Sequence, residues 1–166
     1  MAVGIDVSLT RTALASLGRE QHWRVIKTSP ARTQEVRLRH IADAVYYALR
    51  DWPEPVGLVV METPGFIQRR GSMEAVYRAQ GAVLCGIPSG LDVEIIEVYQ
   101  WRKDLGIRAK KGLGKQPTID FVRAVGVRLP THVGGRVDDD VADAFGLAIW
   151  GRRLLAARLT DEAAAR

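Results

Sequence analysis

The sequence predicts one α/β domain built around a mixed sheet. Three short strand-like segments stand at the start of the chain, and helical and strand-like patterns then alternate to its end. The 166 residues match the usual length of a single domain, 1–166, and no repeat or low-complexity linker divides them. With 47% hydrophobic and 26% charged residues, the composition is that of an ordinary globular protein.

The first thirty residues predict antiparallel strands. The apolar segments Ala2–Val7, Thr12–Leu17 and Trp23–Thr28 are separated by turn-like breaks at 8–11 and 18–21. Parallel neighbours need crossover connections of a dozen or more residues, so breaks this short favour an antiparallel meander.

A helix and then a buried strand are expected next. Apolar residues recur at helical spacing between Thr33 and Trp52, and Pro53 and Pro55 end this pattern. The continuous apolar run Val56–Met61 is typical of a strand that is covered on both faces.

The remaining segments alternate in the same way. A helix is predicted over Ser72–Cys85, with the serine as its N-cap, and a strand over Val93–Val98. Further helices are expected over Gln116–Val125 and Asp139–Leu159, and the tail Thr160–Arg166 is expected to fray. Helices on the faces of a mixed sheet account for this order.

The single cysteine, Cys85, excludes an internal disulfide and a cysteine-based zinc site. Its apolar neighbours predict that it fills the core. No apolar run approaches the roughly 20 residues that span a bilayer, and the N-terminus lacks the pattern of a signal peptide. We therefore expect a cytoplasmic protein without a membrane partner.

Positive charge is concentrated in one part of the chain. The net charge is +5, but between Tyr99 and Arg136 nine basic residues stand against two aspartates, an excess of +7. The basic residues are Arg102, Lys103, Arg108, Lys110, Lys111, Lys115, Arg123, Arg128 and Arg136. A merely solvated surface usually mixes both signs, so this segment favours contact with phosphate.

Acidic residues end two of the predicted strands. Asp6 closes the first strand, and Glu62 follows the buried run that ends at Met61. Open α/β sheets bind ligands at the carboxyl ends of their strands, and neighbouring strands lie about 5 Å apart. If these two strands are neighbours, the two carboxylates share one site; otherwise each acid simply begins a loop.

Further acids open the last predicted helix. The helix macrodipole stabilises acids at a helix N-terminus, which accounts for Asp138 and Asp139. Asp143 lies inside the helix among small and apolar neighbours, where a buried carboxylate is costly unless a cation compensates its charge. Residues three or four positions earlier share its face, and this geometry accepts Asp139 and Asp140 equally.

This group of acids is the donor set of hard divalent cations. Ligands that are all oxygen favour Mg²⁺ or Mn²⁺ over zinc. Two such ions about 3.5–4 Å apart activate a water and stabilise the leaving oxygen in phosphodiester hydrolysis. The acids therefore predict a two-metal nuclease site. His132, in the loop before the acidic helix, is a candidate neighbour of that site, whereas His22 and His40 are expected on the surface.

Five segments follow one another along the chain: GIDVSLTRTALA, VVMETPGF, MEAVYRAQGAVLCGI, KKGLGKQPTIDFV and DDDVADAFGLAIWG. In this order they resemble the RuvC-type Holliday junction resolvases over residues 2–153, and the first segment is most like the phage-borne branch. No single motif is decisive, but their order in a chain of this length is specific. Val7 and Ala13 depart from the proline and glycine that are usual in cellular members.

The resemblance implies a ribonuclease H-like fold, with a five-stranded mixed sheet whose first three strands are antiparallel and with helices on both faces. It implies a homodimer that cuts opposing strands of a four-way DNA junction and leaves 5′-phosphate and 3′-hydroxyl ends. The implied catalytic and metal-binding acids are Asp6, Glu62, Asp140 and Asp143, with two Mg²⁺ ions per site and Mn²⁺ as a substitute. The D-x-x-D-A pattern selects Asp140 and leaves Asp139 as the alternative ligand.

The resemblance also implies DNA contacts beyond these acids. They are Phe66, Arg69, Arg70, Lys110, Lys111 and Lys115. Phe66 matches an aromatic wedge that enters the junction, beside two arginines that suit phosphate contact, although it is equally suited to cap the core. Lys115 matches the lysine of the family's catalytic loop, and the simpler interpretation is that it is solvated.

Three other functions compete with this interpretation. The first is the same chemistry on a wider set of branched DNA, such as flaps and forks, which a phage needs to clear before packaging and which would place the protein in the host cytoplasm. The second is junction binding without catalysis. The third, an actin-like ATPase with a similar GIDxxxT turn, needs two lobes, and 166 residues are too few for them.

Overall fold

The computed structural model describes residues 1–63, 70–108, 112–132 and 134–164. A five-stranded mixed sheet forms its centre, with the strand order β3-β2-β1-β4-β5. The strands are β1 (Ala2–Asp6), β2 (Arg11–Leu17), β3 (Gln21–Lys27), β4 (Leu58–Glu62) and β5 (Asp92–Ile96). The first three are antiparallel, as the sequence predicted, and β4 and β5 run parallel to β1, which makes the sheet mixed.

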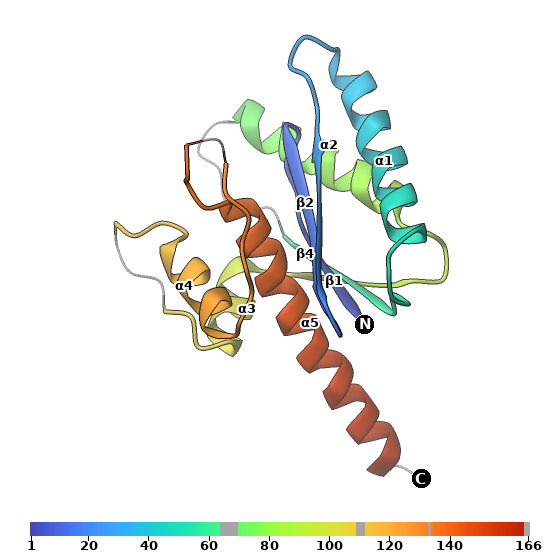
Figure 1. Cartoon of the computed structure of the whole chain (residues 1–166). Coiled ribbons are helices and arrows are strands. Elements are labelled where there is room, and N and C mark those ends of the chain that lie inside the picture. Colours follow the sequence, from blue (N-terminus) through green and yellow to red (C-terminus); the bar gives the residue numbers. More distant parts are fainter. Residues whose placement is uncertain (64–69, 109–111, 133, 165–166) are drawn as a thin grey trace.

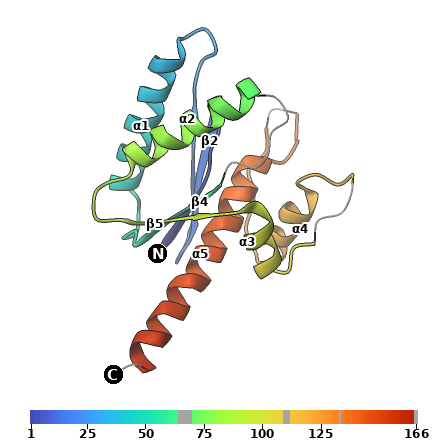
Figure 2. The ribbon, with the colours of Figure 1, turned by 180° about the vertical axis from the view of Figure 1, so that it is seen from behind.

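Helices cover both faces of this sheet (Figures 1 and 2). They are α1 (Gln34–Arg50), α2 (Arg70–Gly86), α3 (Val98–Asp104), α4 (Gln116–Ala124) and α5 (Asp139–Ala164). α1 and α2 pack together on one face, and α5 crosses the other face with α3 and α4 at its side. The predicted arrangement of helices on both faces is confirmed.

The central strands are buried on both sides, which explains their continuous apolar sequence. Val3, Ile5 and Met61 pack against α1 and α2, whereas Leu58 and Val60 lie in the core on the side of α5. The β4 segment predicted from its unbroken apolar run therefore takes the central position that this pattern indicates.

Gly4 of β1 lets α5 lie directly on the sheet. A Cβ atom at this position would lie 2.6 Å from the backbone nitrogen of Ala148 and closer still to the carbonyl oxygen of Ala144. Two glycines of α5 are equally close to their neighbours: Gly151 faces Val60 of the sheet, and Gly146 faces Trp101 of α3. The backbone of the strand and the backbone of the helix are therefore in contact, and this fixes the position of α5.

Several expectations for local structure were wrong. α2 begins at Arg70, so Ser72 lies inside the helix and is not its N-cap. The last strand ends at Ile96, because Val98 already begins α3. Residues 160–164, expected to fray, continue α5; the hydroxyl of Thr160 donates to the carbonyl of Ala156 one turn earlier.

Cys85 is exposed, contrary to its predicted place in the core. α2 turns Ala79, Val83 and Gly86 toward α1 and the sheet, and Cys85 lies on the opposite side of the helix. In the part of the chain that the structure describes, none of the helices has both the length and the hydrophobicity of a membrane span.

We expect Gly4→Ala to destabilise the fold by about 3 kcal/mol, because a methyl group there must push α5 away from β1. Chemical denaturation measures this difference. Gly57→Ala is the matched control, since a Cβ there meets its nearest atom at 3.9 Å and costs little. Equal stability of the two variants would show that the contact between β1 and α5 does not constrain the fold.

Candidate active site

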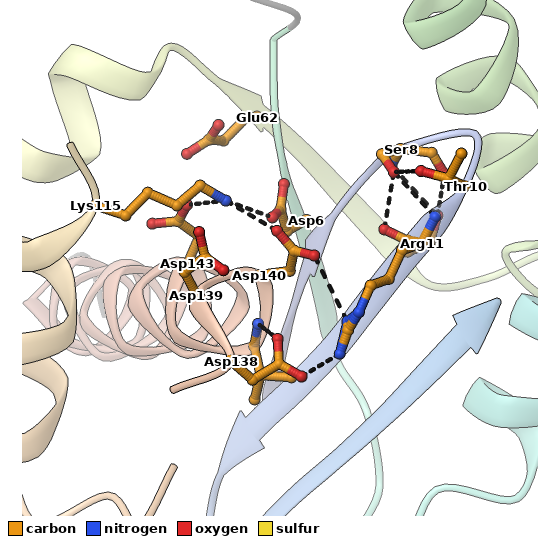
Figure 3. A network of polar contacts seen from close by, with 12 residues as sticks. Asp6, Ser8, Thr10, Arg11, Glu62, Lys115, Asp138, Asp139, Asp140 and Asp143 are labelled. Atoms are coloured by element: carbon orange, nitrogen blue, oxygen red, sulfur yellow. Dashed lines mark hydrogen bonds and ion pairs between the residues drawn. The ribbon is translucent and has the colours of Figure 1, made fainter. Parts of the chain in front are cut away.

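The two strand-end acids lie side by side at one edge of the sheet. β1 and β4 are parallel neighbours, and Ile5 is paired with Met61. The next residues, Asp6 and Glu62, are the last of their strands and therefore lie next to each other at the carboxyl ends. The strands are therefore adjacent, as the shared site required. α5 brings Asp143 to the same edge, where it is only 2% exposed (Figure 3).

The ammonium group of Lys115 lies between three of the predicted acids. Its Nζ is 3.4 Å from Asp6 Oδ2, 3.0 Å from Asp140 Oδ1 and 2.9 Å from Asp143 Oδ2 (Figure 3). Lys115 immediately precedes α4, so this helix delivers the cation to acids from β1 and α5. Three carboxylates thus point toward one cationic position.

α3 supplies two further partners of the acids. The indole Nε1 of buried Trp101 donates to Glu62 Oε1 at 2.7 Å, and Arg102 Nη2 donates to Asp143 Oδ1 at 3.0 Å. The role of Trp101 could not be predicted from the sequence, because an isolated tryptophan gives no signal beyond its apolar character. Arg102 was noted only as part of the basic segment.

Arg11, which the sequence analysis also missed, holds the N-terminal end of α5. Its guanidinium donates to the carboxylate of Asp138, and its Nη1 lies 3.6 Å from Asp140 Oδ2. Asp138 is 4% exposed and accepts a hydrogen bond from the backbone N–H of Val141. Asp138 is therefore a helix cap, as predicted, and in addition an anchor for an arginine that contacts Asp140.

The two candidate partners of Asp143 lie in different surroundings. Asp140 shares Lys115 with Asp143 and Asp6, whereas Asp139 pairs with Arg136 at 3.2 Å. His132 does not reach the four predicted acids; its Nε2 is 3.9 Å from Asp138 Oδ1. His40 is exposed and His22 is partly buried in β3.

Burial and mutual repulsion make the ionised acids costly. Burial raises the pKa of Asp6 from its ordinary value of 3.8 to about 7, although Lys115 opposes the shift. Burial and the charge of Asp143 likewise raise the pKa of Glu62. Burial disfavours the charged form of Lys115, but Asp6, Asp143 and Asp140 outweigh it and raise the pKa of its ammonium group.

The charges of this cluster do not balance. Among the described residues of the cluster, five acids (Asp6, Glu62, Asp138, Asp140 and Asp143) outnumber three cations (Arg11, Arg102 and Lys115), so their net charge is −2 when all are ionised. Among the described residues, no three acidic, histidine or cysteine side chains form a ready-made metal site. The donor chemistry and the excess of negative charge nevertheless fit a divalent cation.

The other predicted contact residues are distributed differently. Phe66, Arg69, Lys110 and Lys111 lie outside the described residues, and Arg70 is the first residue of α2. In the basic segment, Lys103 and Arg108 help to line a cavity of about 520 Å³ that Arg102 also borders. Arg102 and Lys115 are paired with Asp143, so part of the basic segment neutralises this site, whereas Arg136 is paired with Asp139 outside it.

A mixed sheet of order 3-2-1-4-5, flanked by helices on both faces, matches the ribonuclease H-like α/β fold, and acids gather at the carboxyl ends of β1 and β4. Comparison with solved structures makes the fold more specific. The chain is similar to the RuvC protein of Thermus thermophilus in complex with a Holliday junction substrate, with a TM-score of 0.70, 21% identity and coverage of 96% of this chain and 95% of that chain. A second Thermus thermophilus RuvC structure gives a TM-score of 0.69 at 24% identity and covers 96% of both chains.

These two likenesses show that the chain has the RuvC-type fold, and they confirm the fold that the sequence resemblance implied. A Fowlpox virus resolvase, in complex with its substrate Holliday junction DNA, is a more distant neighbour, with a TM-score of 0.43 and 14% identity over 90% of this chain and 96% of that chain. No protein-family model matches the sequence. No curated protein matches it either.

We expect Asp6→Asn to stabilise the fold, in the presence of a chelator, by an amount that depends on pH. Between pH 3.8 and about 7 the folded carboxyl keeps a proton that the unfolded chain has lost. The free energy of unfolding of the unsubstituted protein therefore falls as the pH rises through this range. From pH 5 to pH 8 the advantage of Asp6→Asn should grow by about 2 kcal/mol, measured by urea denaturation. An advantage that is the same at both pH values would contradict the burial of an ionisable Asp6.

Proposed function

We propose that this protein is a structure-selective DNA endonuclease that nicks opposing strands of four-way (Holliday) junctions. The observation that carries the proposal is the convergence of Asp6, Asp140 and Asp143 on one cationic position, with Glu62 beside Asp6, in a RuvC-type fold. The junction DNA in the Thermus thermophilus complex supports the choice of substrate.

We assign the chemistry to phosphodiester hydrolysis with Mg²⁺, for which Mn²⁺ substitutes. Asp6, Glu62, Asp140 and Asp143 would hold two ions, which when bound supply an activated water and neutralise the leaving oxygen. The products would be ligatable 5′-phosphate and 3′-hydroxyl ends. The convergence of carboxylates on the Lys115 ammonium supports this assignment, because side chains arranged in this way surround a positive charge.

The residues around the acids have distinct parts in this proposal. Trp101 orients Glu62 through its indole N–H, and Arg11 holds the N-terminal end of α5 beside Asp140. Lys115 is 35% exposed on its side chain, so it faces both the acids and the solvent from which DNA arrives. We propose that its ammonium group binds an oxygen of the scissile phosphate. It would thereby offset the repulsion between the negative phosphate and the carboxylates.

We expect Asp140→Asn to lower junction cleavage by about 100-fold or more, and Asp139→Asn to cleave close to the unsubstituted rate. Asp140 lies with the other acids at Lys115, whereas Asp139 is paired with Arg136 away from them. Asp6→Asn is the reference for an inactive site. Single-turnover cleavage of a labelled four-way junction in Mg²⁺ measures all three. Full activity of Asp6→Asn would contradict the proposed site. A large loss of cleavage in Asp139→Asn with little loss in Asp140→Asn would show that Asp139, and not Asp140, is the ligand.

Flaps and replication forks are tested in the same assay at matched salt, because binding to phosphate changes steeply with ionic strength. Paired, ligatable nicks in the four-way junction alone support the proposal. Equal rates on flaps and forks would favour the broader branched-DNA nuclease. Binding without cleavage in either Mg²⁺ or Mn²⁺ would favour a junction-binding protein.

We further propose a homodimer, which two coordinated nicks require. One face of α2 supports it, because Tyr77, Gly81, Leu84 and Cys85 are exposed at helical spacing along it. Val93 and Ile95 of β5 are also exposed, and their pairing with Val59 and Met61 places them on the same face of the sheet as α2. A second copy of the chain would cover these apolar side chains. Tyr46 and Tyr47 of α1 are exposed as well and form the alternative interface.

We expect Leu84→Glu to give an 18.3 kDa monomer that has lost paired nicking, because a carboxylate there would be buried between the two copies. Sedimentation velocity at micromolar concentration measures the mass. Leu159→Glu is the matched control: Leu159 is 66% exposed on the distal half of α5, and its replacement should leave the dimer intact. An unsubstituted protein that sediments only as a monomer would contradict the dimer, and an unaffected Leu84→Glu would exclude this face.

A further inference from the structure

A second basic surface lies between β3 and α1, apart from the acid cluster. It surrounds a cavity of about 320 Å³, which is lined by Val36 and by six polar residues, the basic Lys27, Arg32, Arg37 and His40 and the hydroxyl-bearing Thr28 and Ser29. No acidic residue is among those that line it. We call these six residues the β3–α1 basic surface.

The cations of this surface differ from those of the candidate active site. Arg11, Arg102 and Lys115 each lie within 4 Å of a carboxylate. Across the described ranges, Lys27, Arg32 and Arg37 form no ion pair with an acid. Their charge is therefore left for an external anion.

Arg37 is held in place by neutral groups. Its Nε donates to Thr28 Oγ1 at 2.9 Å, and its Nη2 donates to the carbonyl oxygen of Leu9 at 3.1 Å. These acceptors orient the guanidinium without neutralising it. Lys27 and Arg32 are exposed beside it, so the surface combines one fixed cation with two adjustable ones.

Hydrogen bonds connect this surface to the turn that carries the site residues. The hydroxyl of Thr28 also donates to Leu9, and the backbone N–H of Thr28 donates to the carbonyl of Thr10 at 3.0 Å. Leu9 and Thr10 lie in the turn between Asp6 and Arg11. Two segments lie toward the end of the molecule opposite the C-terminus: the connection between β3 and α1, and the N-terminal end of α5 (Figure 1).

We propose that the β3–α1 basic surface binds the phosphodiester backbone of a duplex arm of the branched DNA, away from the scissile phosphate. The inference rests on the proposed function. Arginine, lysine, serine and threonine are the side chains that contact DNA phosphates and fix the orientation of a duplex. No phenylalanine, tyrosine or tryptophan side chain lines the cavity, and sequence-tolerant binding of single strands relies mainly on such side chains for base stacking. A duplex arm is therefore the form of DNA that suits this surface.

The test compares Lys27→Gln/Arg32→Gln with the unsubstituted surface in an Asp6→Asn background, which removes cleavage. Fluorescence anisotropy measures the affinity for four-way junctions with short and with long arms over a range of salt concentrations. The double variant should bind long-armed junctions at least several-fold more weakly and short-armed junctions about equally. The slope of log affinity against log salt should fall in magnitude by about 2, since each lost phosphate contact contributes about 0.9.

Arg19→Gln/Arg152→Gln is the matched control, because among the described residues neither arginine forms an ion pair with an acid. Arg19 lies in the β2–β3 turn and Arg152 donates to the carbonyl of Leu17 at the end of β2, so the same charge is removed from the opposite end of the sheet. If both double variants weakened the affinity for long-armed junctions equally, the effect would come from net charge alone, and the proposal would be overturned. An unchanged affinity of Lys27→Gln/Arg32→Gln for long-armed junctions would also overturn it. Failure of the unsubstituted protein to bind or cleave branched DNA would instead contradict the proposed function.

Discussion

The contact between the backbone of β1 at Gly4 and the backbone of α5 is the constraint on which the acid cluster depends. Asp6 is two residues beyond Gly4 along the strand, and Asp143 precedes Ala144, whose carbonyl meets that glycine. A strand and a helix that approach this closely have almost no freedom to slide or tilt. The two carboxylates therefore keep their relative position without any direct bond between them.

Rigid placement of the acids creates an electrostatic cost that neighbouring elements offset. Lys115 lies just before α4, Arg102 belongs to α3 and Arg11 to β2, so cations from three separate parts of the chain surround one edge of the sheet. The compensation is incomplete, as the raised pKa of Asp6 shows. An arrangement that leaves negative charge in a buried position is unfavourable for folding, and it is what a site for external cations requires.

The order of strands and helices, and the acids at the strand ends, followed from local patterns in the sequence. The unbroken apolar run before Glu62 predicted a central strand, and such a strand places its last residue at the edge where ligands bind. The partners of the acids did not follow, because Trp101 and Arg11 act through contacts between residues 39 and 127 positions apart. The burial of Cys85 was predicted wrongly because its neighbours in sequence are apolar, while the helix sets which of them face inward. The choice between Asp139 and Asp140 likewise depends on where α4 brings Lys115, which helix periodicity alone does not show.

The separation of paired from unpaired cations has a consequence for kinetics. Cations that already neutralise carboxylates add little to the long-range field, whereas Lys27, Arg32 and Arg37 contribute fully to it. Under the proposed function, attraction of DNA from solution and chemistry at the acids would be carried by different residues. Encounter rates would respond to ionic strength through the β3–α1 basic surface, while the rate of bond cleavage, once DNA is bound, would be largely insensitive to it. Substitutions in this protein could then change the rate of DNA capture without changing the rate of cleavage.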